Sequence, residues 1–434
     1  MVPAIILFVI TYVLMLTFSK FRPYIALASG VIFILTGMLP LGNVLGALDF
    51  NVLLMIAGTM GLVQLFIDSK MPALLADAVM AKVPNVQWAA VCLALFAGVI
   101  SAFVDNVATV LMIAPVALEI CRKLKTNPVP FIIGIAVSSN LQGAATLVGD
   151  TTAIMLGSAL DMTFMDFFWY LGKPSIFFAV ELGAVISAFI LLVIFRKEKA
   201  PIPGTGEMTR VEDYVPTVLL VGAIGLLVCA SFAPDSWNLP GEINGLICCA
   251  LLVVGLIYNV ARYKRLTALT GPLKAIDVET LGLLVGLFLM IGGMESRGVI
   301  AALGNLLAGM GGNGIFLLFT VIVWASVLIS AFIDNIPYVA TMIPVIGSLA
   351  ATLAPELGVE ASVLGVPLYF GLLSGATLGG NCTPIGASAN ITGIGILRRE
   401  GYEVKNSDFF KIGIPFTLAA IIPAYIYIWL VFGM

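Results

Sequence analysis

Residues 100–116 read ISAFVDNVATVLMIAPV, and residues 329–345 repeat this stretch as ISAFIDNIPYVATMIPV. Nine of the seventeen positions are identical at a constant offset of 229, including the Asp-Asn pair in the middle of each copy. Both copies lie in long apolar runs, where an ionised aspartate near the centre of a bilayer costs about 2.5–3.5 kcal/mol. Because this cost recurs at matching positions, the repeat indicates that Asp105 and Asp334 have a function.

The composition is that of a polytopic helical membrane protein. Of the 434 residues, 61% are hydrophobic and 10% are charged, whereas soluble domains average about 25% charged residues. The net charge of −3 gives no indication of nucleic-acid binding. The six cysteines show no CxxC spacing, and the lack of histidine excludes a His-based metal site and an imidazole proton carrier. We expect no cofactor, with Na+ as a coupling ion or substrate in some alternatives.

Apolar runs predict two halves with the same order of elements. We expect an all-α protein with an inverted repeat of five membrane-spanning helices and one re-entrant hairpin per half, or ten spanning helices and two hairpins in total. One spanning helix in each half is interrupted by a polar stretch. The first half has runs at 3–18, 24–39, 50–68, 130–160 and 175–195, with hairpin arms at 86–104 and 107–121. The second half has runs at 215–232, 242–260, 280–294, 363–397 and 412–432, with arms at 314–331 and 336–353.

A polar linker at 196–214 separates the predicted repeats, 1–199 and 212–434. The odd number of spans inverts the second repeat, and this topology places 19 of the 21 basic residues on one side, with only Lys173 and Arg297 on the other. The positive-inside rule makes the first side cytoplasmic and puts both termini outside. Two full spans in place of each hairpin leave this sidedness unchanged. Hairpins are favoured because they bring both Asp-Asn pairs to the midplane.

The predicted hairpin tips carry side chains that suit a cation or a neutral solute. Each aspartate is also a candidate N-cap of the following arm, and each asparagine offers an acceptor and a donor. A serine lies one helical turn before each aspartate, on the same face. The candidate ligands at the tips are Ser101, Asp105, Asn106, Ser330, Asp334 and Asn335. The two Asp-Asn pairs among them, Asp105-Asn106 and Asp334-Asn335, are also the candidate Na+ ligands.

Two polar interruptions form the second group of candidates. ATLVGDTT (145–152) matches ATLGGNCT (376–383) at an offset of 231. Glycine lets the chain leave helical geometry, so that freed carbonyls can hold a cation and the N–H groups of the next half-helix an anion or oxygen-rich solute. In the alternative interpretation Asp150 and Asn381 only cap the following half-helices, with Pro384 near the first turn. The candidates are Thr146, Gly149, Asp150, Thr151, Thr152, Thr377, Gly379, Gly380, Asn381 and Thr383.

These motifs resemble those of the ion transporter superfamily, over nearly the whole chain. The group includes arsenite-efflux permeases, NhaD-type sodium/proton antiporters, the melanosomal P protein and divalent-anion/sodium symporters. The stretches that carry the resemblance are AFVDNVATVLMIAPV, AFIDNIPYVATMIPV, ATLVGDTTAIMLGSA and GGNCTPIGASANI, and they are most similar to the arsenite permease and P protein branch. The resemblance implies two hairpins, two broken helices, a homodimer and an elevator-type movement.

The sequence departs from parts of the superfamily pattern. The symporter branch has Ser-Asn-Thr at both tips, where this chain has Asp-Asn-Val at 105–107 and Asp-Asn-Ile at 334–336. This difference argues against dicarboxylate transport. The Pro-Pro-Asn that usually follows Gly-Asp is Thr-Thr-Ala at 151–153, so one set of ligands is expected to differ.

The residues and the resemblance together predict a secondary active transporter and no enzymatic activity. The expected cycle is proton-coupled efflux of an arsenite- or antimonite-type solute, with Na+/H+ antiport and Na+-coupled anion symport as alternatives. Asp105, Asp334 and Asp150 are the expected proton-exchanging groups, because neighbouring carboxylates in a low dielectric cannot all ionise cheaply. An intramembrane aspartyl protease requires GxGD, but Leu147 stands two residues before Gly149. A passive channel stays open as an alternative.

The same reasoning predicts how the protein is organised. A scaffold is expected from 1–85 and 215–310, and a moving transport domain from 86–195 and 311–434. Short segments at 71–82 and 297–309 join the two. The expected partners are a small inorganic solute or ion, the lipid bilayer and a second copy of the chain, in a bacterial or archaeal plasma membrane.

Overall fold

The computed structural model describes residues 1–201, 208–310 and 314–433, and its regular structure is almost entirely helical. Predictions for linker residues 202–207, and for 311–313 and 434 of the second repeat, lie outside the described residues. The first half contains α1 (Val2–Thr17), α2 (Arg22–Leu35), α3 (Val44–Ala47), α4 (Phe50–Asp68), α5 (Met71–Met80), α6 (Val86–Ser101), α7 (Asn106–Leu124), α8 (Val129–Gln142), α9 (Thr151–Ala159), the strands β1 (Trp169–Tyr170) and β2 (Lys173–Pro174), and α10 (Ile176–Ile194). The second half contains α11 (Val215–Ser231), α12 (Ile243–Tyr263), α13 (Thr270–Ala275), α14 (Val278–Ser296), α15 (Val299–Met310), α16 (Ile315–Ser330), α17 (Asn335–Leu357), α18 (Ala361–Gly379), α19 (Ser388–Arg399) and α20 (Asn406–Phe432).

Many of these helices are membrane-spanning by length and composition. In the described part of the chain, seven helices are long and apolar enough to cross a bilayer, or up to nine if two sharply bent pairs each count as one span. The predicted number of ten is larger, partly because several predicted spans form short helices. For example, α2 and α8 have 14 residues each, or about 21 Å at 1.5 Å per residue. The protein is therefore an integral membrane protein with several apolar helices.

Matching residues start two of the long helices. The Asp49 carboxylate accepts a hydrogen bond from the Val52 N–H at 3.0 Å and caps α4. The Asp277 carboxylate accepts from the N–H groups of Glu279 at 3.0 Å and Thr280 at 3.1 Å and caps α14. Because such capping satisfies N–H groups that lack a partner within the helix, the same residue type fixes the same helix start in both halves.

Helices from the two halves pack in exchanged pairs. α2 packs along α14 and α4 along α12, while α6 packs on α8 and α16 on α18. Glycines allow the two exchanged pairs to approach closely. A methyl group added to Gly58 would lie 2.6 Å from the carbonyl carbon of Cys248, and one added to Gly286 would lie 2.3 Å from that of Ala26. These glycines occupy positions that match at an offset of 228 in the sequence.

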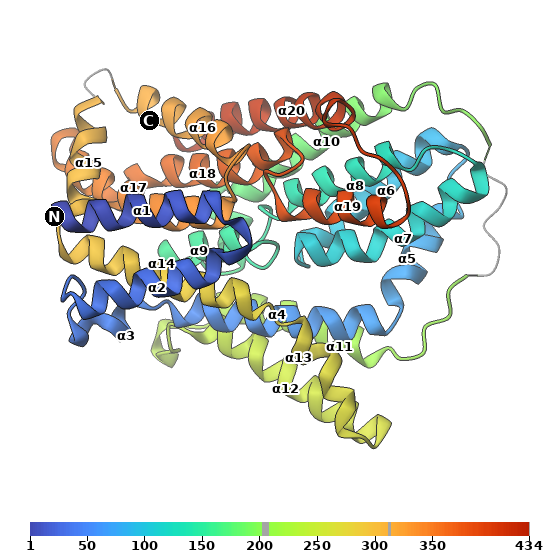
Figure 1. The fold of residues 1–434 in the computed structure, drawn as a ribbon, viewed down its shortest axis with the longest axis horizontal. Coiled ribbons are helices and arrows are strands. Elements are labelled where there is room, and N and C mark those ends of the chain that lie inside the picture. Colours follow the sequence, from blue (N-terminus) through green and yellow to red (C-terminus); the bar gives the residue numbers. More distant parts are fainter. Residues whose placement is uncertain (202–207, 311–313, 434) are drawn as a thin grey trace.

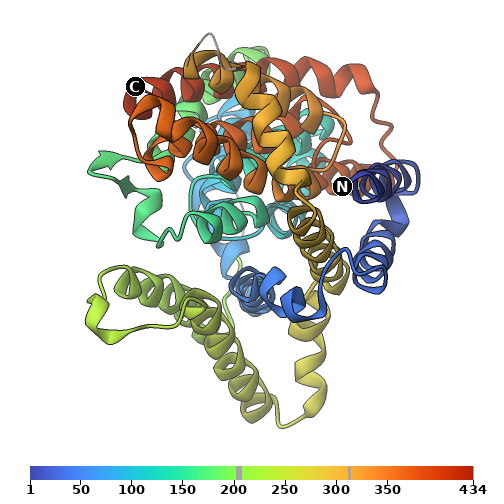
Figure 2. The same cartoon turned by 90° about the vertical axis from the view of Figure 1, so that its left-hand side faces the viewer.

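The helices form two groups. In Figure 1, α2, α3, α4 and α11 to α14 form the lower part of the molecule, and α6 to α10 and α16 to α20 gather above them. The turned view in Figure 2 shows that the yellow-green α11 and α12 project furthest from the rest. In Figure 1 α6 and α7 lie toward the right-hand end, and α16 and α17 toward the left. The two helical hairpins therefore enter the upper group from opposite ends.

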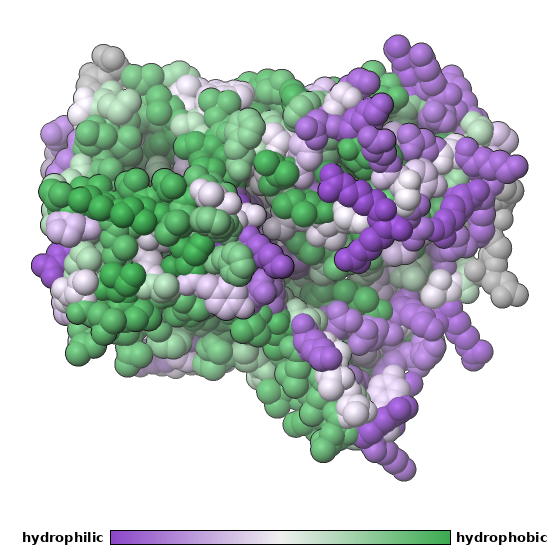
Figure 3. Space-filling view, viewed as in Figure 1, coloured by the Kyte–Doolittle hydropathy of each residue, from purple (hydrophilic) through white to green (hydrophobic). Residues whose placement is uncertain are grey.

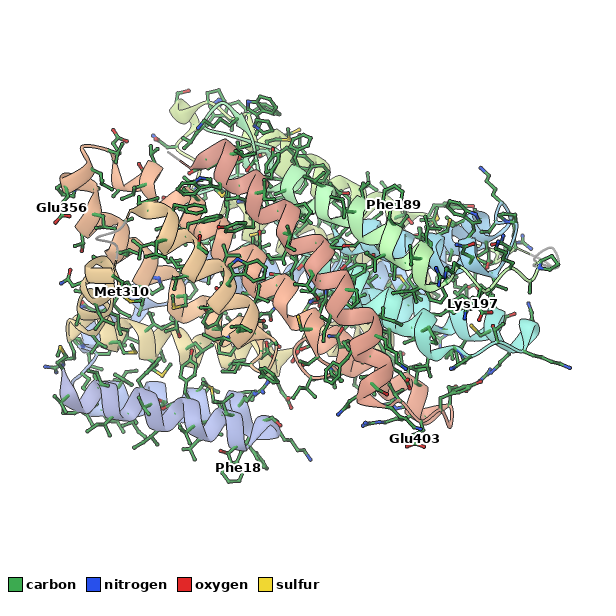
Figure 4. All side chains as sticks on the ribbon, turned by 90° about the horizontal axis from the view of Figure 1, so that it is seen from above. Phe18, Phe189, Lys197, Met310, Glu356 and Glu403 are labelled. Carbon is green, nitrogen blue, oxygen red and sulfur yellow. The ribbon has the colours of Figure 1, made fainter. Side chains whose placement is uncertain are left out.

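The two ends of the long axis differ in polarity. Figure 3 shows hydrophilic side chains gathered at the right-hand end, and mainly hydrophobic ones over the rest of the visible face. Lys197 and Glu403 lie at this end, whereas Met310 and Glu356 lie at the other (Figure 4). Phe18, at the turn between α1 and α2, lies between the two ends. Both termini lie toward the left in Figure 1, away from the hydrophilic end.

Candidate functional site

Both predicted hairpin tips are helix starts that an aspartate caps. Asp105 Oδ1 accepts hydrogen bonds from the N–H groups of Val107 at 3.0 Å and Ala108 at 3.1 Å, and α7 begins at the next residue. Asp334 Oδ1 accepts from the N–H of Ile336 at 3.2 Å at the start of α17. The capping role predicted for these two aspartates is therefore present at both tips. It leaves the second carboxylate oxygen of each aspartate for another partner.

Asn140 links the first tip to the opposite half of the chain. Its Oδ1 accepts a hydrogen bond from Asn106 Nδ2 at 2.9 Å, and its own Nδ2 donates to the Thr377 carbonyl at 2.8 Å and to Asn381 Oδ1 at 3.1 Å. Asn381 Nδ2 in turn donates to the Val137 carbonyl at 2.9 Å. Asn140 is not among the predicted ligands, although an asparagine in an apolar run is itself a signal, and its side chain is fully buried.

The second tip contacts the first polar interruption. Asn335 Nδ2 donates to Asp150 Oδ2 at 3.3 Å, and the Thr152 hydroxyl donates to the same oxygen at 3.0 Å. Thr152 also lies 3.2 Å from the Thr377 hydroxyl. The two tips and the two interruptions, which are far apart in the sequence, are thus joined by one network of buried side chains.

The predicted alignment of the two interruptions is wrong by six residues. α18 continues through Thr377 to Gly379 and is followed by the short 3-10 helix η7 (Gly380–Cys382). A methyl group on Gly149 would lie 2.6, 3.0 and 3.0 Å from the carbonyl oxygens of Gly143, Ala102 and Ser101. On Gly386 it would lie 2.6, 2.8 and 2.9 Å from those of Gly380, Ala331 and Ser330. The equivalent motif is therefore G-x-x-T-x-x-G at 143–149 and 380–386, an offset of 237.

This equivalence corrects two capping predictions. Asp150 precedes α9, but it makes no side-chain hydrogen bond to the helix N-terminus. The equivalent of Asp150 is Ala387, which precedes α19, and Asn381 lies in η7 rather than at a helix start. Pro384 lies between η7 and α19 and is not in the first turn of either helix. α9 and α19 therefore begin without a side-chain cap.

Four of the predicted ligands hold the hairpins against the broken helices. The Thr146 hydroxyl donates to the Ala102 carbonyl, and the Thr383 hydroxyl to that of Ala331. Ser101 accepts a hydrogen bond from the Ser139 hydroxyl at 3.0 Å, while the Ser330 hydroxyl donates to the Ala376 carbonyl. All four side chains are buried. Their role as ligands stays a prediction, and the structure gives each a partner within the protein.

A cavity of about 330 Å³ lies between the tips and the helices α4, α13 and α14. It contains three carboxylates, and among the described residues no lysine or arginine lines it. The predicted ligands that line it are Asp105, Asn106, Asp150, Thr151 and Asn335. Five further polar residues line it without having been predicted as site residues: Gln64, Asn140, Asp277, Thr280 and Ser388. The polar lining residues are Gln64, Asp105, Asn106, Asn140, Asp150, Thr151, Asp277, Thr280, Asn335 and Ser388.

The starts of α9 and α19 add positive potential to this acidic cavity. Thr151 and Ser388 are the first residues of these helices, and both line the cavity. A helix N-terminus carries a partial positive charge and N–H groups without a partner in the helix. An oxygen-bearing solute can therefore contact N–H donors on one side and carboxylate acceptors on the other.

Arg22 forms an ion pair at the second tip that was not predicted from the sequence. It begins α2, and its Nη1 lies 3.3 Å from Asp334 Oδ2. In the sequence Arg22 counts only among the basic residues of a cytoplasmic loop, because its distance of 312 residues from Asp334 hides the contact.

A bundle of apolar helices with a buried polar site between two hairpin tips is the architecture of a secondary transporter. A family model described as citrate transporter matches residues 7–365, and the chain belongs to this family. An uncharacterized transporter of Mycobacterium bovis is 33% identical over 343 residues, which cover 78% of this chain and 76% of that protein. The human P protein is 26% identical over 455 residues, covering 86% of this chain and 52% of the P protein.

Solved structures of transporters share the fold. The Alcanivorax borkumensis YdaH transporter matches with a TM-score of 0.60 and 14% identity, over 93% of this chain and 89% of that chain. MtrF of Neisseria gonorrhoeae, described as one of a class of antimetabolite efflux pumps, matches with a TM-score of 0.56 and 15% identity, over 93% and 85%. At this level of identity the likeness concerns the fold alone. The chain is a secondary transporter of the citrate transporter family.

Proposed function

We propose that this transporter exchanges protons for an arsenite- or antimonite-type neutral trihydroxide and expels the solute from the cell. The observation that carries this proposal is the set of side chains around the cavity. It combines the carboxylates of Asp105, Asp150 and Asp277 with amides and hydroxyls, and no basic side chain among the described residues lines it. Such a set accepts hydrogen bonds from hydroxyl groups and repels a bare anion.

Competition at the carboxylates supplies the proposed coupling. Asp105 and Asp150 line one cavity, so both cannot carry a charge without a mutual penalty in a low dielectric. When protonated, they lose acceptor oxygens for a trihydroxide. A site of this kind also holds Na+ when ionised, so that Na+/H+ antiport through Asp105, Asn106, Asp334 and Asn335 is the alternative use of the same groups.

A second candidate substrate is a citrate-type carboxylate that enters with bound cations. The family description and the open N-termini of α9 and α19 favour it. A polyanion would face three carboxylates in the cavity, and co-bound cations would remove that repulsion. This candidate predicts that the carboxylate is carried only when a divalent cation is present.

We further propose an inverted repeat that works as an elevator in a homodimer. The exchanged packing of α2 on α14 and α4 on α12 supports the repeat, and the opposed entry of the hairpins supports the inversion (Figure 1). The transport domain comprises 86–195 and 311–434, and the scaffold 1–85 and 215–310. The hydrophilic, basic end faces the cytoplasm by the positive-inside rule, which places both termini outside.

The test is transport by purified protein in liposomes with an imposed pH gradient. The panel contains arsenite, antimonite, Na+, citrate alone and citrate with Mg²⁺. We expect arsenite or antimonite to accumulate against its own gradient and to collapse the pH gradient as it moves. Transport of citrate only with Mg²⁺ would replace the first candidate by the second. Flux that only dissipates the gradient of the solute would identify a channel and overturn the proposal.

A further inference from the structure

The ion pair between Arg22 and Asp334 joins two parts of the chain that the elevator model assigns to different bodies. Arg22 belongs to the predicted scaffold and Asp334 is the tip of the second hairpin. Their side chains are only 23% and 19% exposed, so solvent screens the pair less than an exposed one. Arg22 Nε also donates to the Met15 carbonyl at 3.2 Å. The guanidinium is thereby fixed at the turn between α1 and α2.

A second contact accompanies the pair. The Tyr12 hydroxyl in α1 donates to the Pro337 carbonyl at 2.6 Å and lies 2.5 Å from the Thr341 hydroxyl in α17. α1 and the start of α2 therefore bind the first turns of α17 at the tip of the second hairpin. Any displacement of this hairpin along the scaffold has to break both contacts.

The first hairpin has no equivalent arrangement. Asp105 corresponds to Asp334 in the repeat, but the ion pairs of the described residues include none at Asp105. Asp105 instead lines the acidic cavity, whereas Asp334 is not among its lining residues. Asp334 pairs with Arg22, and the neighbouring Asn335 donates a hydrogen bond to Asp150. Two aspartates that are identical in the sequence motif thus have opposite electrostatic surroundings.

We propose that Arg22 is a built-in counter-ion of Asp334. In this conformation Arg22 pairs with the Asp334 carboxylate, and it replaces the cation, Na+ or a proton, that this carboxylate binds when the hairpin has moved away. This inference rests on the proposed cation-coupled function. An arginine remains protonated at all physiological pH values, so it competes with the cation for Asp334 without titrating itself. In this conformation Asp334 is neutralised by the protein and releases its cation, while Asp105 and Asp150 remain open to the cavity.

The test measures cation binding rather than transport, so it does not depend on the identity of the substrate. The thermal unfolding of purified Arg22→Gln, Asp334→Asn and the double variant is compared with that of the wild-type protein. One arm varies Na+ against choline at constant ionic strength and pH, and the other varies pH without Na+. A ligand that binds only the folded state raises its stability in proportion to ln(1 + [L]/Kd). Arg22→Gln should bind the cation about tenfold more tightly or better, and this gain should vanish in the double variant.

Two further variants serve as controls for charge and folding. Arg22→Lys keeps the positive charge and should behave like the wild type, while Lys20→Gln removes a charge from the same turn and should leave the cation response unchanged. If Arg22→Gln does not fold because Asp334 is left unpaired, Arg22→Met, which keeps the apolar stem, replaces it. An equal cation response in Arg22→Gln and the double variant would overturn the counter-ion role. Failure of transport with a gain in binding would instead count against the proposed cycle.

Discussion

At the scale of single residues, the chain shows how identical sequence motifs acquire different roles. The aspartate of each Asp-Asn pair caps a helix, and the repeat alone predicts that both pairs lie near a common site. It does not predict that Asp105 opens onto a cavity while Asp334 meets Arg22. The ion pair depends on α2, which begins at Arg22, whereas the corresponding helix of the second half, α12, begins at Ile243. The spacing of motifs therefore cannot predict a role that depends on a contact between residues far apart in the sequence.

The acidic tips give the first prediction. Asp105→Asn and Asp334→Asn each keep an oxygen that can cap the helix, but neither side chain can exchange a proton or hold a full charge. We expect both variants to fold and to lose transport driven by a pH gradient in proteoliposomes. Asp408→Asn, at the start of α20, is the matched control and should transport normally. Wild-type flux in both tip variants would reduce the two aspartates to helix caps.

Asn140 gives the second prediction. Asn140→Ala removes the acceptor of Asn106 and the donor to Asn381 and the Thr377 carbonyl, and each buried polar group left without a partner costs about 1–3 kcal/mol. We expect a clearly lower melting temperature in detergent and loss of transport. Ser362→Ala, at an exposed hydroxyl near the start of α18, should change neither. Unchanged stability of Asn140→Ala would show that water replaces the asparagine network.

At the scale of helices, apolar runs and glycines locate most elements but not their detailed ends. The hairpin arms begin and end close to the predicted residues, because their apolar length is visible in the sequence and because an aspartate caps the second arm of each hairpin, α7 and α17. The predicted position of the second interruption is six residues too early, because ATL and the glycines that follow it resemble the first interruption. In the structure α18 continues through Thr377 and ends only at Gly379, since packing against α16 and α17 keeps this stretch helical.

The exchanged helix pairs give the third prediction. Gly58→Ala and Gly286→Ala place a methyl group against the backbone of α12 and α2, which cannot move aside as a side chain can. Overpacking of this kind typically costs about 1–3 kcal/mol. We expect both variants to melt at lower temperature, as followed by size-exclusion chromatography after heating. Gly225→Ala in α11, where nothing lies within 4 Å of the added methyl, should melt like the wild type or higher. Equal melting of all three would contradict close packing at the crossings.

At the scale of the whole molecule, two cavities are lined by equivalent residues of the proposed scaffold. The acidic cavity and a smaller one of about 210 Å³ share seven positions of the proposed scaffold at an offset of 228. These pairs are Met60/Phe288, Val63/Ile291, Gln64/Gly292, Ile67/Glu295, Ala47/Ala275, Asp49/Asp277 and Val52/Thr280. The walls formed by the hairpins differ. The first hairpin lines the acidic cavity with residues from Asp105 to Met112, and the tip of the second hairpin adds Asn335 and Ile336. The second hairpin lines the smaller cavity with Ala340, Ile343 and Pro344, which match positions 111, 114 and 115.

This offset supports a sliding movement of defined size. On average the second hairpin presents residues about five positions further along its helix than the first hairpin does, or about 8 Å at 1.5 Å per residue. If the halves are an inverted repeat, exchanging their positions generates the opposite conformation of the transporter. In that conformation Asp49 lies by the tip of the second hairpin, as Asp277 now lies by the first. Asp334 then leaves Arg22 and faces a carboxylate, where it requires a cation.

Crosslinking tests this exchange and gives the fourth prediction. Ala47 and Ile343 line the small cavity together, and Ile336 lies seven residues before Ile343 on the same face of α17, about 10 Å away along the helix. In a background without the six native cysteines, Ala47→Cys with Ile343→Cys should crosslink in the present conformation. Ala47→Cys with Ile336→Cys should crosslink only in the opposite one, and either bond should stop transport until it is reduced.

A scaffold pair, Leu65→Cys with Leu219→Cys around Gly255, should crosslink without stopping transport. An actively transporting protein whose Ala47→Cys and Ile336→Cys never react would contradict a sliding hairpin, because the proposed exchange of the two halves requires these two positions to meet once in every cycle.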